Sequence, residues 1–195
     1  MNIILASTSK IRQAILANAG VTFTVLDAAI DESSVKLRLQ GDDARRIAME
    51  LAKQKSEKIS REFPQGLVIG ADQTLGFQNE IFSKPISKAE ARNQLLKLKG
   101  NIHTLYSAIS CSSAGKETWT YCAEANLTMR NFSDQFLDDY LNSEQISYTS
   151  SVGGYKLEEV GIQLFDRIDG DYFGILGLPI LPLLEFLRSK NLIQS

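Results

Sequence analysis

The sequence has few of the residues that build disulfide frameworks and zinc sites. Its 195 residues include 2 cysteines and 1 histidine. Cys111 and Cys122 could pair across a hairpin, but so low a cysteine content favours two free thiols in a reducing compartment. His103 has no second histidine or Cys-x-x-Cys motif to join it, so we expect no zinc site. We expect His103 to be a satisfied strand residue rather than a base.

Long apolar runs and an excess of one charge are also missing. No run approaches the roughly 20 residues of a membrane helix, and the first residues lack the basic segment of a signal peptide. Lys and Arg number 21 against 23 Asp and Glu, a net charge of −2. The chain therefore has no bulk positive field for a nucleic-acid backbone. We expect a cytoplasmic protein with no membrane or nucleic-acid partner.

The composition is that of a folded domain. Apolar residues make up 44% and charged residues 23% of the chain, which excludes wholesale disorder. A chain of this length buries about 70% of its extended surface, enough for a core without disulfides. The sequence contains no internal repeats or linkers, so residues 1–195 are treated as one domain.

Strand and helix patterns intermingle along the chain. Strands are expected at 2–6, 22–26, 67–71, 102–112, 117–130 and 162–168, the fourth and fifth joined as a hairpin around Ala114 and Gly115. Helices are expected from the Ser7–Ser9 turn to Gly20, from Asp42 and Asp43 to about Arg61, at 88–98 after Ser87, at 134–142 after Ser133, and after Pro179. This order predicts an α/β fold with a mixed sheet.

The turn from Ser7 to Arg12 joins the first strand to the first helix. Free N–H groups and the positive end of a helix attract anions at such a turn, and phosphate is the usual ligand. Lys10 and Arg12 lie where the helix dipole disfavours cations, a cost that an anionic ligand would offset. Without a ligand, Ser7 or Ser9 would be an ordinary N-cap and the cations solvated. The glycine-rich pattern of a P-loop is absent.

Further acids and bases lie in loops and in the long helix. Asp72 directly follows the apolar strand at 67–71, at the carboxyl end where ligands collect in α/β sheets. Glu32 follows another acid in a loop, Lys84 precedes a proline, and Lys55 lies in the long helix. Taken alone, Asp72 is compatible with a buried structural residue that caps the following turn, and the others are compatible with solvated surface charge. Only their combination points to a site.

In order, these segments resemble the Maf family of nucleotide pyrophosphatases. The matching strings span almost the whole chain, and their order is more specific than any one of them. They are Leu5-Ala6-Ser7-Thr8-Ser9 with Arg12, Asp31-Glu32, Leu51-Ala52 with Lys55, Gly70-Ala71-Asp72, Lys84-Pro85, Leu98-Lys99-Gly100 with His103, Val152-Gly153-Gly154-Tyr155, Ile168-Asp169-Gly170-Asp171-Tyr172 and Gly177-Leu178-Pro179.

The resemblance implies a fold and an activity. The fold would be an elongated mixed α/β sheet with flanking helices, similar to inosine triphosphate pyrophosphatases, with two lobes around a nucleotide cleft. The activity would be hydrolysis of a nucleoside triphosphate between its α and β phosphates, a house-cleaning of nucleotides. A divalent metal (Mg²⁺ or Mn²⁺) and a homodimer are also implied.

Residue roles follow from the resemblance and from the chemistry of a polyanionic substrate. Glu32 and Asp72 would hold the metal, because hard cations take oxygen ligands, and Asp72 would also orient or deprotonate the attacking water. The triphosphate would be bound by Ser7, Ser9, Arg12, Lys55 and Lys84, with Lys10 as an addition and Lys84 also counted as catalytic. Glu158 would face either the base or a second metal.

The sequence departs from the family's commonest pattern at three places. The turn Ser9-Lys10-Ile11-Arg12 replaces Ser-Pro-Arg-Arg, and Gln73 replaces a threonine. Glu158 stands where the branch that takes dTTP and UTP has a glutamine. In this segment the sequence resembles more closely the branch that prefers 7-methyl-GTP. A carboxylate there could favour a cationic methylated purine.

A second interpretation remains open at this point. Members of the family have been linked to septum formation and cell-division arrest, so the chain could act as a non-enzymatic regulator that binds a partner or nucleic acid. The metal-binding acid pair favours the enzyme, since a binding protein has no need of it. The altered turn at residues 9–12 favours the regulator.

Overall fold

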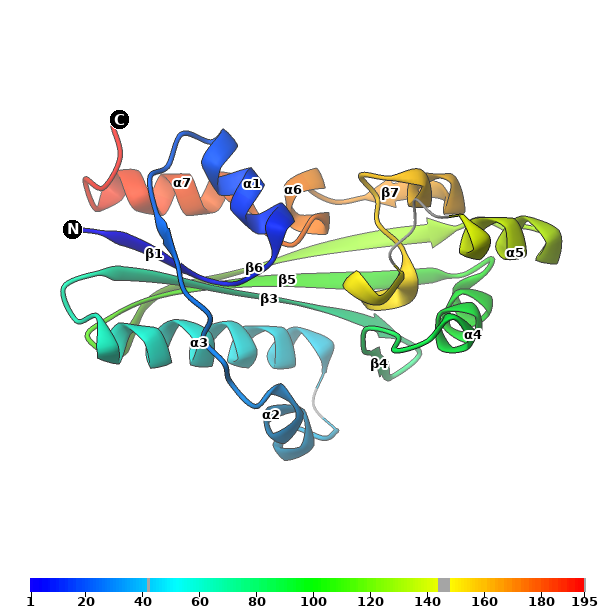
Figure 1. The fold of residues 1–195 in the computed structure, drawn as a ribbon, viewed down its shortest axis with the longest axis horizontal. Coiled ribbons are helices and arrows are strands. Elements are labelled where there is room, and N and C mark those ends of the chain that lie inside the picture. Colours follow the sequence, from blue (N-terminus) through cyan, green and yellow to red (C-terminus); the bar gives the residue numbers. More distant parts are fainter. Residues whose placement is uncertain (42, 144–147, 195) are drawn as a thin grey trace.

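The computed structural model describes residues 1–41, 43–143 and 148–194 and contains an elongated mixed sheet (Figure 1). Within these ranges the sheet has seven strands in the order β2-β1-β3-β5-β6-β7, with β4 paired to β3. The strands are β1 (Ile3–Ala6), β2 (Thr24–Val25), β3 (Leu67–Phe77), β4 (Glu80–Phe82), β5 (Ile102–Ser113), β6 (Lys116–Met129) and β7 (Phe165–Asp169). β1 is parallel to β2 and β3 and the other pairs are antiparallel, which confirms the predicted mixed α/β fold.

Helices cover both faces of this sheet. They are α1 (Lys10–Asn18), α2 (Glu32–Arg38), α3 (Ala44–Glu62), α4 (Lys88–Leu98), α5 (Asp134–Asn142), α6 (Tyr172–Ile175) and α7 (Ile180–Ser189), with short 3₁₀ turns η1 (Tyr148–Ser150), η2 (Val152–Gly154) and η3 (Val160–Leu164). Figure 1 shows α3 along one face and α1, α6 and α7 on the other, with α4 and α5 at one end. None of the helices in the described ranges is long and apolar enough to span a membrane.

Three predicted helix starts are confirmed by capping hydrogen bonds. The side chain of Asp43 accepts from the amide of Arg46 at 2.7 Å, that of Ser87 from Glu90 at 3.2 Å, and that of Ser133 from Phe136 at 3.1 Å. These bonds satisfy amide groups that have no partner inside the helix. Asp42, predicted to share the start of α3, lies outside the described residues.

Several predicted boundaries are wrong. β3 does not stop at residue 71 but continues to Phe77, because β5 pairs with it from Val68 to Gly76 and β4 pairs with its last residues. The strand expected at 22–26 is only two residues long. The strand expected at 162–168 begins at Phe165, after η3. The short elements α2 and β4 were not predicted at all, since neither carries an apolar run long enough to stand out.

The two largest hydrophobic clusters lie along the length of the sheet. One includes Leu75, Leu105 and Leu127 and packs against α4 and α5. The other includes Leu5 and Ile109 and packs against α1 and α7. The division into two lobes around a cleft stays a prediction.

Gly70 lets α3 approach the sheet unusually closely. A Cβ at Gly70 would lie 2.1 Å from the carbonyl oxygen of Ala52 and 2.7 Å from the amide nitrogen of Ser56. The small buried side chains of Ala52 and Ser56 extend this close contact along the helix. Lys55 lies between Ala52 and Ser56 on the same helix. The close packing brings its Nζ within 2.6 Å of Asp72 Oδ1 on β3.

We predict that Gly70→Ala lowers the free energy of unfolding by about 3 kcal/mol, because two backbones must separate to admit a methyl group. Chemical denaturation would measure the loss. Gly76→Ala on the same strand is the matched control, since its Cβ would lie 3.2 Å from the Cβ of Ala44. Equal losses in the two variants would contradict the role given to Gly70.

Candidate functional site

Arg12 is the residue of the first turn that the fold draws inward. Its Nε donates to the carbonyl oxygen of Gly177 at 2.9 Å, and its Nη1 donates to the carbonyl oxygen of Ala71 at 2.8 Å and to Ser7 Oγ at 3.3 Å. Desolvation lowers the pKa of Arg12, while the charges of Asp72 and Glu32 act to raise it. Arg12 is thus a fixed cation beside the two acids.

The other polar residues of this turn behave differently from one another. Ser9 takes the N-cap position of α1, but its side chain makes no capping hydrogen bond. Ser7 is buried and its Oγ accepts from the amide of Ser9 at 3.4 Å. Lys10 is exposed. The start of α1 therefore keeps donors that no side chain caps.

Asp72 lies inside β3 rather than at its end, which corrects the prediction. Ala6, the last residue of β1, pairs with Gly70, so the parallel neighbour stops two residues before Asp72 while β5 continues alongside on the other edge. The Asp72 side chain therefore stands just past the carboxyl end of β1. Asp72 is therefore not at the carboxyl end of its own strand, as predicted, but beside the carboxyl end of the parallel strand β1.

Lys55 joins the two predicted metal-binding acids. Its Nζ lies 2.6 Å from Asp72 Oδ1 and 2.7 Å from Glu32 Oε1. Glu32 is the first residue of α2, whose N-cap is Asp31, and the Asp31 carboxylate accepts from the amide of Ser34 at 3.1 Å. The adjacent acids thus divide their roles, because Asp31 caps the helix and Glu32 enters the site.

The charge of Lys55 shapes the titration of Glu32. Burial acts to raise the pKa of Glu32, but the charge and hydrogen bond of Lys55, with smaller effects from Lys36 and Lys84, outweigh it and leave the pKa below its ordinary value. Glu32 is therefore a carboxylate over a wider pH range than an isolated glutamate.

Lys84 completes the cluster from the segment after β4. Desolvation and the charge of Arg12 lower its pKa, whereas Glu32 and Asp72 act to raise it. Pro85, which follows Lys84, is buried, so the chain is anchored at that point. The fold thus brings Arg12, Lys55 and Lys84 together with both acids.

Glu158 is not joined to this cluster. It is exposed between η2 and η3, and among the described residues no hydrogen bond or ion pair links it to the five charged groups. Its neighbour Glu159 instead pairs with Lys156 at 2.8 Å. The role of Glu158 toward a base or a second metal stays a prediction.

The histidine and the cysteines take no part in the cluster. His103 is buried, its Nε2 lies 2.6 Å from the hydroxyl of Tyr155, and burial lowers its pKa to about 4. Cys111 and Cys122 are both free. His103 is thus a buried strand residue, as predicted, but only one of its ring nitrogens is satisfied, because among the described residues its Nδ1 has no hydrogen-bond partner. The two thiols form no disulfide, as predicted.

Sequence reasoning named Gly177 and Gln73 as parts of the family pattern but missed their part in the surroundings of Arg12. Gly177 has a positive φ of 96°, and a Cβ there would lie 3.2 Å from Arg12 Nε. Gln73 holds the end of α6, which comes just before Gly177, because its Nε2 donates to the carbonyl oxygen of Ile175 at 2.8 Å. The same Nε2 donates to Ser107 Oγ at 2.8 Å. The glycine was a usable signal, whereas backbone acceptors leave no trace in a sequence.

The two acids fit a hard divalent cation. They converge on a single ammonium group, which lies between one carboxylate oxygen of each acid. Across residues 1–41, 43–143 and 148–194, no three His, Cys, Asp or Glu side chains gather as a metal cluster. The chain therefore offers two oxygen ligands, the arrangement in which Mg²⁺ takes its remaining ligands from water and phosphate.

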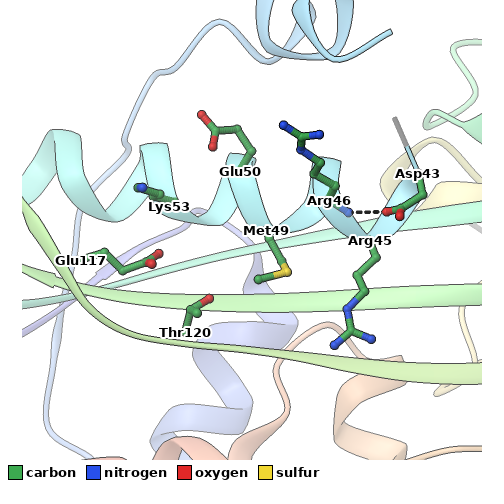
Figure 2. A pocket seen from close by; sticks show the side chains of 8 residues that line it. All are labelled: Asp43, Arg45, Arg46, Met49, Glu50, Lys53, Glu117 and Thr120. Atoms are coloured by element: carbon green, nitrogen blue, oxygen red, sulfur yellow. Dashed lines mark hydrogen bonds between the residues drawn. The ribbon is translucent and has the colours of Figure 1, made fainter. Parts of the chain in front are cut away.

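A surface pocket elsewhere does not involve this cluster (Figure 2). It has a volume of about 310 Å³ and lies between α3 and the hairpin strand β6. Its charged lining is mixed in sign, with Arg45, Arg46 and Lys53 beside Asp43, Glu50 and Glu117. This mixture offers no excess charge for a polyphosphate.

Known proteins resemble the chain over nearly its full length. Residues 2–190 match the family described as Maf-like protein. A nucleoside triphosphate pyrophosphatase of Nitrobacter hamburgensis is 43% identical over 192 residues, covering 98% of this chain and 95% of the relative. One of the same name from Caulobacter vibrioides is 47% identical over 186 residues, covering 94% and 93%. Among solved structures, the Staphylococcus aureus Ham1 protein aligns at 20% identity and a TM-score of 0.42, over 66% of this chain and 72% of that one.

We predict that Glu32→Gln costs stability at pH 7 but little at pH 3. Because the pKa of folded Glu32 is lowered, its stabilisation is present above the unfolded value of about 4.3 and is lost as the pH falls through the folded value. The cost at pH 7 should stay below about 1 kcal/mol, since the side chain is partly exposed. Urea denaturation at both pH values would measure it, with Glu62→Gln at the exposed end of α3 as the control. A cost that does not change with pH would contradict the assignment.

Proposed function

The chain belongs to the Maf-like family, and we propose that it hydrolyses nucleoside triphosphates to the monophosphate and pyrophosphate with the help of a divalent cation. The observation that carries the proposal is the convergence of Glu32, Lys55 and Asp72, with Arg12 and Lys84 in electrostatic reach. Relatives that align over nearly their whole length bear an enzyme name. This favours hydrolysis over the purely regulatory interpretation.

The charges of the cluster suit a polyphosphate. A triphosphate carries about four negative charges, so catalysis consists mainly of positioning and electrostatic stabilisation. Arg12 would bind phosphate oxygens from a fixed position, because its Nε and Nη1 donate to backbone carbonyl groups and hold the guanidinium group in place. Lys55 and Lys84 would approach the same phosphates from α3 and from the segment after β4.

The two acids would serve the water and the cation. Glu32 and Asp72 would hold the divalent cation, which when bound supplies neutralisation of charge on the bridging oxygen. Asp72 would orient the attacking water and accept its proton. Asp72 lies inside β3 and pairs with Ala108 of β5, which gives that carboxylate a rigid backbone, as a catalytic acid or base requires.

We predict that Asp72→Asn folds but loses at least about a hundredfold in kcat, because the variant cannot accept a proton or hold a cation with full charge. The measurement is pyrophosphate release from ordinary and methylated nucleoside triphosphates with Mg²⁺ or Mn²⁺. Asp166→Asn, exposed on β7, is the matched control and should keep wild-type activity. Wild-type turnover in Asp72→Asn would remove Asp72 from the mechanism.

We further propose a preference for 7-methyl-GTP that depends on Glu158. An exposed carboxylate can stabilise the positive charge of a 7-methylated guanine, whereas a glutamine cannot. Glu158→Gln should therefore lower kcat/KM for 7-methyl-GTP about tenfold relative to GTP, because one charge contact with the base is lost. Glu159→Gln, which breaks only the pair with Lys156, is the control. An unchanged ratio in Glu158→Gln would show that the preference, if present, lies elsewhere.

A further inference from the structure

Lys55 occupies the position that a cation would take between the two acids. Its ammonium group is in direct contact with one oxygen of Glu32 and one of Asp72, at 2.7 and 2.6 Å. The Lys55 side chain is only 13% exposed, and its backbone belongs to the helix that Gly70 holds against the sheet. The contact is therefore built into the fold and is not a chance surface pair.

A divalent cation cannot share these oxygens with the ammonium group. Mg²⁺ binds carboxylate oxygens at about 2.0–2.1 Å, so an ion between the same two atoms would lie against the Lys55 nitrogen. Two positive charges at that separation repel strongly where solvent is partly excluded. Either the ammonium group or the metal ion can hold the acid pair.

The net charge of the cluster decides which one does. Arg12, Lys55 and Lys84 supply three positive charges against the two negative charges of Glu32 and Asp72, an excess of one. Lys36 adds another positive charge within electrostatic reach of Glu32. A divalent ion alone would increase this excess, whereas a metal–triphosphate complex, with a net charge of about −2, would neutralise it.

We propose that Lys55 is an internal counter-cation that keeps the acid pair closed to free divalent metal and moves to the phosphates when a metal–nucleotide complex binds. This inference rests on the proposed function, because it takes the metal and the nucleotide from there. It assigns Lys55 a second role besides phosphate binding. The consequence is an order of events in which metal and nucleotide enter together.

The test is Mn²⁺ binding to the nucleotide-free protein, measured by electron paramagnetic resonance. Lys55→Met keeps the length of the side chain and removes its charge, and it should bind Mn²⁺ about fivefold to tenfold more tightly than wild type, the effect of losing two contact ion pairs. Lys55→Arg keeps the charge and should bind as weakly as wild type. Circular dichroism would verify that each variant is folded.

Lys36→Met is the matched control. It removes a positive charge near Glu32 without removing a contact to Asp72, so it reports the general electrostatic effect. The gain in Lys55→Met must exceed that in Lys36→Met severalfold, and an equal gain would overturn the proposal. Lys55→Met should also bind a non-hydrolysable α,β-methylene triphosphate more weakly than wild type. Weaker binding of both ligands would indicate a merely structural role and overturn the proposal.

The two proposals fail in different ways. If the wild type releases pyrophosphate but Lys55→Met gains no Mn²⁺ affinity, the counter-cation role is wrong and the proposed function stands. If no nucleotide is hydrolysed although Lys55→Met gains Mn²⁺ affinity, the competition at the acid pair is supported and the proposed function is wrong.

Discussion

The structure of the charged cluster depends on one contact, the ammonium group of Lys55 between the carboxylates of Glu32 and Asp72. Two acids in a partly desolvated place repel each other unless a cation lies between them. The three residues come from α2, α3 and β3, which are separate in sequence. Their contact ties α2 to the sheet, while the packing of Val35 against α3 and the ion pair between Arg38 and Glu50 hold the same helix against α3.

The close packing of α3 on the sheet makes that contact possible. Gly70, Ala52 and Ser56 place only small side chains between helix and strand, and Lys55 of this helix reaches Asp72, which lies two residues past the end of the β1 pairing. The chemistry is thus set by small residues that carry no charge. The one polar side-chain atom among these three small residues, Ser56 Oγ, is buried in the tight interface and forms a hydrogen bond with Ser112 Oγ at 2.7 Å.

Much of the fold and of the cluster could be predicted from local sequence. Hydrophobic alternation and capping residues located the central strands and the long helices, because these signals are local. The ordered motifs singled out Arg12, Glu32 and Asp72. The full length of β3 could not be predicted, because polar residues such as Asp72 and Gln73 look like the end of a strand and only the pairing with β5 continues it. The carbonyl groups that hold Arg12 are likewise set by tertiary structure and by no residue type.

The long strands restrict how the molecule can change shape. β3, β5 and β6 each pass from one hydrophobic cluster into the other as hydrogen-bonded ladders, with one register shift, between Cys111 and Ser112, in the pairing of β5 with β6. The two ends of the sheet therefore cannot rotate about a hinge unless several of these hydrogen bonds break. The Asp72 carboxylate is carried by β3 inside this ladder, so its backbone keeps a constant position relative to both hydrophobic clusters.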